Sequence, residues 1–190
     1  MKTIFLASLS LLAACSVMPE QAAVVVHHDL GASLHAPAGR APLPLKRINV
    51  SAAPVVQGLA MHYREAAAPT RRGVYARHRW AAPPPALLRQ SLQRLLPLQE
   101  SGRCLVQLHL SDFILEVDAA GAASALLAAE LQLKLEGQPG GLQRVVDQRV
   151  GLPRPGPGEM AQGLAQAVDR LDEIIEQWLD QPAARALCTP

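Results

Sequence analysis

Three cysteines carry the most nucleophilic side chains of this chain. Cys15 lies near the start of the sequence, whereas Cys104 and Cys188 lie in its second half. A thiol can be acylated, can form a disulfide or can bind a metal, and its surroundings decide between these outcomes. Each of the three therefore has to be judged by the residues around it.

Cys15 ends the run Leu12–Ala13–Ala14–Cys15, which follows one lysine and a short apolar stretch. A positive charge, an apolar segment and small residues are the parts of a secretory signal. The apolar segment has about eleven residues, too few to span a membrane, which takes roughly 20. A cysteine directly after small residues resembles the lipobox of bacterial lipoproteins. That resemblance implies cleavage before Cys15 and acylation of its thiol by chains such as palmitate; the alternative is an ordinary secretory signal with a chance cysteine.

The predicted acyl anchor would hold the mature protein at a membrane. Each buried methylene contributes ~0.8 kcal/mol, and stable anchoring takes more than one chain, which a triacylated cysteine provides. Ser16, rather than an aspartate, follows the cysteine. By resemblance to lipoprotein sorting rules, this favours the periplasmic face of the outer membrane over retention at the inner membrane.

Cys104 and Cys188 are the two thiols that remain if Cys15 is acylated. A pair of thiols in an oxidising compartment can form a disulfide. Their loop exceeds about eighty residues, so the chain-entropy treatment gives a stabilisation of about 4–5 kcal/mol. Two unpaired thiols are the alternative, because the sequence does not supply the Cα distance that a bridge requires.

The composition favours one globular domain and argues against binding to nucleic acids. Hydrophobic residues make up 49% of the chain and charged residues 18%, as in chains with a buried core. The net charge of +2 and the 3% of aromatic residues provide neither a basic surface nor many rings for stacking. We expect a signal peptide over 1–14, a lipidated N-terminus with tether and first strand over 15–45, one domain over 46–182 and a C-terminal tail over 183–190.

The spacing of apolar residues predicts a mixed α/β domain. The patterns favour strands at 23–27, 46–50, 59–64, 73–80, 104–117, 125–135 and 143–150. The last three strands are joined by short turns and should form an antiparallel meander. Helices are predicted from the prolines at 83–85 to residue 96 and over about 159–180, each with one apolar stripe. We therefore expect a mixed sheet of about five to six strands packed by two amphipathic helices.

Other groups that could do chemistry are sparse. Two sets of residues could suggest a metal, namely His27–His28–Asp29 and Asp112, Glu116 and Asp118. Neither set has a recognised ligand spacing, and adjacent histidines on a strand point to opposite faces. Asp112 and Glu116 share one face if no bulge intervenes, but the alternation slips near them. The sequence has no nucleophile elbow, phosphate loop or dinucleotide fingerprint. We therefore expect no catalytic residue, metal or cofactor, and favour binding or scaffolding.

An ordered series of residues, from the third predicted strand to the first helix, resembles one family. The series is Met61–His62–Tyr63–Arg64, Tyr75, Arg79–Trp80–Ala81, Pro83–Pro84 and Leu87–Leu88. It is similar to the ABC-type transport auxiliary lipoproteins, the PqiC-like family, over nearly the whole mature chain. The resemblance implies that Tyr63, Arg64, Arg79, Trp80 and Pro83 define the fold rather than contact a ligand.

The same resemblance implies an accessory role. Such a protein would have a membrane, an MCE-domain protein and ABC transporter components as partners, and would assist lipid traffic between membranes without bond chemistry. Some members of the family assemble into homo-oligomeric rings. A different scaffold for envelope assembly or secretion is the main alternative, and a periplasmic enzyme is the less favoured one.

Overall fold

The computed structural model describes residues 24–31, 43, 45–96 and 98–189. The predicted signal peptide, Cys15 and Ser16 lie outside the described residues. The predictions of cleavage, acylation and sorting therefore stay predictions.

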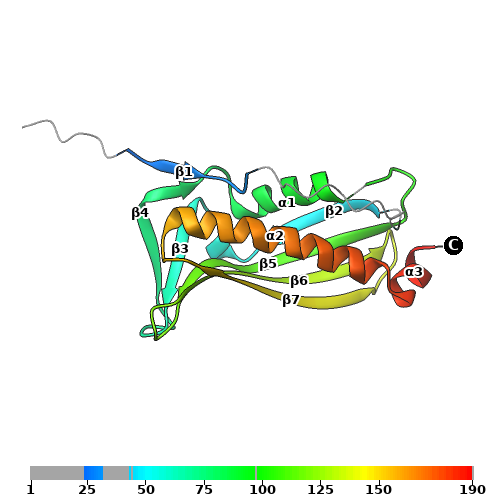
Figure 1. Cartoon of the computed structure of the whole chain (residues 1–190). Helices are drawn as coiled ribbons and strands as arrows, with labels where there is room; N and C mark the ends of the chain where they lie inside the picture. Colours follow the sequence, from blue (N-terminus) through cyan, green and yellow to red (C-terminus); the bar gives the residue numbers. More distant parts are fainter. Residues whose placement is uncertain (1–23, 32–42, 44, 97, 190) are drawn as a thin grey trace, which may run out of the picture.

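A mixed sheet of seven strands forms the body of the protein (Figure 1). The strand order is β1-β4-β3-β5-β6-β7, and β2 also pairs with β5. The strands are β1 (Val26–His28), β2 (Leu45–Ala52), β3 (Ala60–Glu65), β4 (Arg72–Trp80), β5 (Cys104–Val117), β6 (Ala123–Leu135) and β7 (Leu142–Leu152). The predicted α/β class is confirmed, and β5, β6 and β7 form the expected antiparallel meander.

β5 is long enough to pair with two strands end to end along one of its edges. β2 runs parallel to its first half as far as Leu110, and β3 runs parallel to its last residues from Ile114 to Val117. A short 3-10 turn, η1 (Pro54–Val56), follows β2. The register of β5 on β6 shifts between Leu110 and Asp112. This bulge precedes Asp112, so the alternation continues unbroken from Asp112 to Val117.

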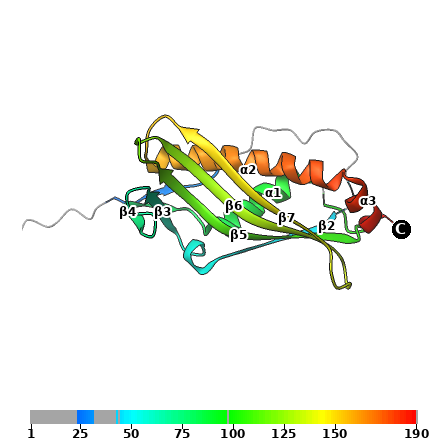
Figure 2. The ribbon, with the colours of Figure 1, turned by 90° about the horizontal axis from the view of Figure 1, so that it is seen from below.

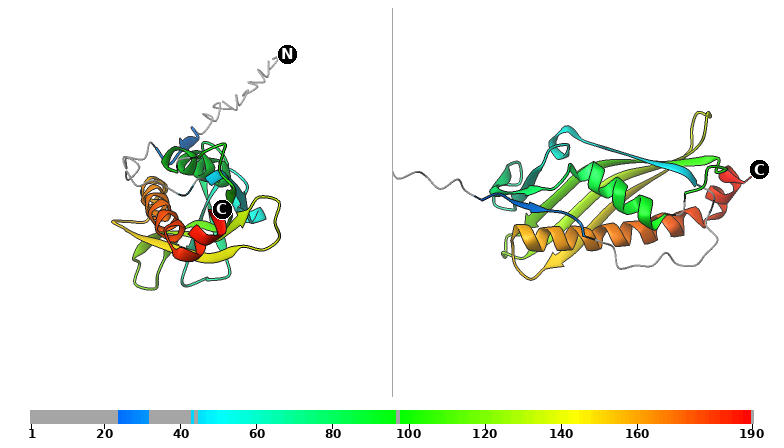
Figure 3. Two further views of the ribbon diagram at one scale, coloured as in Figure 1. Left: turned by 90° about the vertical axis from the view of Figure 1, so that its right-hand side faces the viewer. Right: turned by 90° about the horizontal axis from the view of Figure 1, so that it is seen from above.

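Two helices cover one face of the sheet and leave the other face open (Figures 2 and 3). α1 (Pro84–Leu95) begins directly after Pro83, and prolines occupy its first turn, where a missing N–H costs nothing. α2 (Pro157–Leu179) buries one stripe against the sheet, including Leu164, Leu171 and Ile175. Each such side chain contributes roughly 1.5–3 kcal/mol before entropy is counted.

Residues 183–190, which we expected to form a C-terminal tail, include most of a third helix instead. α3 (Pro182–Cys188) starts at Pro182, a residue that ends α2 but also suits the first turn of a new helix. Ala184 and Cys188 are both buried. The expectation was wrong because packing and a covalent bond hold this segment against the sheet.

Candidate functional site

The disulfide that the sequence left open is present between Cys104 and Cys188. It joins the first residue of β5 to the last residue of α3 across a separation of 84 residues, with the Cα atoms 5.5 Å apart. Both cysteines are buried. The bond therefore fixes α3 at one end of the sheet.

The residues singled out by the family resemblance occupy structural positions. Trp80 ends β4, is fully buried, and packs against Phe113 with ring centroids 5.2 Å apart. Arg79 donates from Nη1 to the carbonyls of Tyr75 at 2.6 Å and His78 at 2.9 Å. These contacts stabilise the corner between β4 and α1. Pro83 occupies the N-cap position of α1.

Tyr63 and Tyr75 pack on each other. Their ring centroids are 5.1 Å apart and tilted by 47°, an arrangement that aromatic pairs favour. Burial is the main cause that raises the pKa of Tyr75, and neighbouring Tyr63 adds to it. The pair belongs to the packing between β3 and β4.

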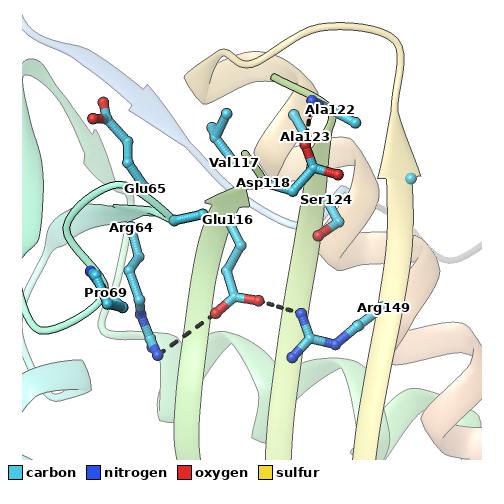
Figure 4. Close-up of a pocket in the computed structure, with 12 residues that line it drawn as sticks. Arg64, Glu65, Pro69, Glu116, Val117, Asp118, Ala122, Ala123, Ser124 and Arg149 are labelled. Carbon is cyan, nitrogen blue, oxygen red and sulfur yellow. Dashed lines mark hydrogen bonds and ion pairs between the residues drawn. The ribbon is translucent and has the colours of Figure 1, made fainter. Parts of the chain in front are cut away.

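The open face of the sheet carries a row of alternating charges, which we call the charge ladder. Arg64 of β3 lies between two carboxylates of β5, with Nη2 3.3 Å from Asp112 Oδ1 and Nη1 3.6 Å from Glu116 Oε1. Arg72 of β4 pairs with Asp112 on one side. Arg149 of β7 pairs with Glu116 on the other, as Figure 4 shows for the Arg64–Glu116–Arg149 part. Asp147 completes the row, 3.4 Å from Arg149 Nε.

Strand register produces this ladder. Arg64 is directly opposite Arg72 on one side and Glu116 on the other. Asp112 and Glu116 share a face because the bulge lies before both of them. Ile114, between them on the same face, is fully buried although no helix covers it. Long arginine side chains bury their stems in this way while keeping the charged heads near water.

A depression of about 500 Å³ lies beside the ladder (Figure 4). Arg64, Glu116 and Arg149 form its polar wall, while Val117 and Ala123 contribute apolar surface. Arg149 bonds to the central carboxylate, and this bond is the main cause that raises the pKa of its guanidinium. The charges on this wall are thus paired with one another.

Most of the residues considered for metal binding have other partners. Asp118 accepts hydrogen bonds from the backbone of Ala120 at 2.9 Å and Ala122 at 2.8 Å, which closes the turn between β5 and β6. His28 Nε2 lies 2.9 Å from Nδ1 of His78. Within the described residues, no three histidine, cysteine or acidic side chains gather as metal ligands would.

Sequence reasoning missed three members of the ladder, Arg72, Asp147 and Arg149. Nothing in the immediate neighbours of the two arginines marks them, because Arg72 and Arg149 meet Asp112 and Glu116 from strands that are distant in sequence. The detectable signal was the spacing of Asp112 and Glu116. Among the helices of the described part, none is both long and apolar enough to cross a membrane.

Comparison with known proteins identifies the fold. No family model matches the chain, and no curated protein matches it. One solved structure, of an uncharacterised protein, superposes with a TM-score of 0.64 at 16% identity, covering 83% of this chain and 99% of the other. A second, protein XCC0632 from Xanthomonas campestris of the DUF330 family, gives 0.65 at 15% identity, covering 82% and 91%.

These neighbours correct the family expectation. The resemblance indicated the PqiC-like auxiliary lipoproteins, but the structural neighbours point to the DUF330 fold instead. At this level of identity they show a shared fold and nothing about activity. The short motif from Met61 to Leu88 misled because its residues serve packing, as Trp80 and Arg79 do here.

Proposed function

We propose that this chain is a lipid-anchored periplasmic docking protein that serves a transport assembly of the cell envelope. In this proposal, acylated Cys15 holds the folded domain at the inner leaflet of the outer membrane. The domain binds other components, an MCE-domain protein and ABC transporter subunits being the partners to test first. It carries out no bond chemistry of its own.

The run Leu12–Cys15 after an apolar segment is the observation that carries the proposal. Charge, apolar length, small residues and a cysteine coincide there, as in lipoprotein signals. The Cys104–Cys188 disulfide supports it, because such bonds persist in oxidising compartments such as the periplasm. The charge ladder adds a surface whose charges are mutually satisfied, which suits contact with a protein better than turnover of a substrate.

Labelling of cells with a palmitate analogue tests the anchor. The wild-type chain should take up the label, and Cys15→Ser should not. Cys104→Ser is the matched control, because it removes another cysteine while leaving the predicted lipobox intact. Equal labelling of wild type and Cys15→Ser would contradict the proposal.

Purification of the lipoprotein from membranes tests the partner. Cross-linked wild-type protein should bring down an MCE-domain protein or an ABC permease, identified by mass spectrometry. Reversal of the ladder by Arg64→Glu and Arg149→Glu should weaken that association while labelling at Cys15 continues. Recovery of other envelope proteins alone would favour a different scaffold, and an unchanged yield from the reversed variant would exclude the ladder as the contact.

A further inference from the structure

Exposed hydrophobic side chains gather at one end of this molecule. The described part of the chain has seven large hydrophobic side chains that remain exposed. Six of them lie in or directly beside β1, η1, β3 and β4, and we call this group the apolar end: Val24, Val25, Val26, Val55, Leu59 and Val74. The seventh, Val145, lies on β7. Single exposed valines are ordinary on protein surfaces, but a concentration of this kind marks an interaction surface.

Several of these side chains lie on or beside β4. Val26 of β1 is opposite His78 of β4, and Val74 lies four positions earlier on the same strand, opposite His62 of β3. The backbone of Val55 is close enough to the His62 ring to affect its pKa. Figure 1 shows β1 and β4 at one end of the elongated molecule and α3 at the other.

The same end is basic. Arg71 and Arg77 are exposed, and neither has an acidic partner within the described residues. Arg79 adds a further positive charge on β4, whereas the charge of Arg72 is paired with Asp112, and Asp29 and Glu65 are other acids nearby. Clusters of arginine beside apolar side chains are typical of surfaces that contact anionic lipid headgroups.

The length of chain between the predicted anchor and the fold limits where this end can lie. Val24 follows Cys15 by nine residues, and a fully extended chain of that length spans about 30 Å at most. The acyl group therefore keeps β1 close to the bilayer, while α3 lies at the far end of the molecule. A surface so close to lipid and so apolar has the bilayer itself as its nearest partner.

We infer that the apolar end rests on the bilayer that holds Cys15, with its valines at the headgroup boundary and Arg71 and Arg77 against anionic lipids. This inference rests on the proposed function, because it takes the acyl anchor as given. It goes further by fixing an orientation: β1 and β4 face the membrane, and α3 with the Cys104–Cys188 bond points away from it. Partners would then approach the side or the far end of the domain.

Fluorescence quenching on vesicles tests the orientation with the acylated mature protein. A cysteine introduced at one position would be the reactive thiol, since Cys104 and Cys188 are bridged and Cys15 is acylated. Val24→Cys and Val145→Cys form a matched pair, because both valines are 80% exposed. Each would carry the same fluorophore, on vesicles of phosphatidylethanolamine and phosphatidylglycerol that contain nitroxide-labelled lipid.

The label at Val24, and one at Val74→Cys, should be quenched several-fold more strongly than the label at Val145. Equal quenching at all three positions would overturn the inference, because a domain that swings freely on its tether presents every side to the membrane. The double variant Arg71→Gln/Arg77→Gln should reduce quenching at Val24, whereas Arg103→Gln, before β5 near the disulfide, should not. Failure of the protein to associate with the vesicles after the acylation step would instead refute the anchor.

Discussion

The ring of Tyr63 occupies the space that a side chain at Gly73 would need. The two residues are directly opposite each other on β3 and β4. A Cβ atom built at Gly73 would fall within the tyrosine ring, far inside contact distance. The ring in turn packs on Tyr75. Gly73 is therefore a packing requirement of the β3–β4 hairpin.

Replacement of this glycine should destabilise the hairpin. Gly73→Ala forces the Tyr63 ring out of its position, and overpacking of this kind costs typically 1–3 kcal/mol. Urea unfolding measures the loss in the free energy of unfolding. Gly151→Ala on β7 is the control, because nothing lies within 4 Å of its Cβ position. Equal effects of the two substitutions would contradict the packing argument.

Loss of the central carboxylate should weaken the charge ladder. Glu116→Gln leaves Arg64 with Asp112 and Arg149 with Asp147 as their remaining acids. Because Glu116 and Arg64 are only 20% and 24% exposed, we expect a loss of about 1–2 kcal/mol, above that of an exposed pair. Glu130→Gln, an exposed residue on β6 of the same face, should change the free energy of unfolding little. If the loss in the free energy of unfolding caused by Glu116→Gln vanished in low salt, this would count against a stabilising role of the ladder.

Removal of the disulfide should lower stability more than any of these changes. Cys104→Ser/Cys188→Ser frees a loop of 84 residues, which should cost about 2–5 kcal/mol. Thermal unfolding with and without reductant measures the effect in the wild type. Reductant should not change the melting temperature of the double variant. If reductant left the melting temperature of the wild type unchanged as well, a structural role for the bond would be refuted.

Stability should rise with pH around the ordinary pKa of histidine. Burial, and then the neighbouring His78, lower the pKa of His28 from 6.5, and burial also lowers the pKa of His62. The unfolded chain thus binds protons more readily than the folded chain between the lowered pKa and 6.5. The histidines contribute their full stabilisation above about pH 6.5. This stabilisation is lost as the pH falls through their lowered pKa in the folded protein.

Burial of His28 is the main structural cause of this effect, and His78, whose Nδ1 lies 2.9 Å from His28 Nε2, adds to it. Melting temperatures measured from about pH 5 to about pH 8 should rise less in His28→Gln than in wild type. His109→Gln, at an exposed position on β5, should keep the wild-type slope. Identical slopes in all three proteins would contradict the assignment.

The periodicity of apolar residues was enough to predict most elements of the fold. Val106, Leu108 and Leu110 alternate with polar residues and do line the core side of β5. The stripe on α2 is buried as its spacing requires. The parallel pairing of β2 and β3 with β5 could not be predicted, because it depends on contacts between segments that are far apart in the sequence.

The candidate surfaces were harder to predict than the elements. Asp112 and Glu116 were considered as a pair, but their arginine partners come from β3, β4 and β7. Which arginines pair with these two acids depends on strand register, and the local sequence pattern does not encode that register. The apolar end was missed for the same reason, since Val26 comes to lie beside the strand of Val74 only when β1 pairs with β4.

β5 accepts β2 and β3 along the same edge, and this constrains how the domain can be made. In a chain delivered from its N-terminus, whether by a ribosome or through a membrane, β2 and β3 emerge about forty residues or more before the strand they need. Their apolar faces stay in water during that interval, open to mispairing with other chains. β2 and β3 thus stay without the strand that pairs with them until β5 is complete at residue 117.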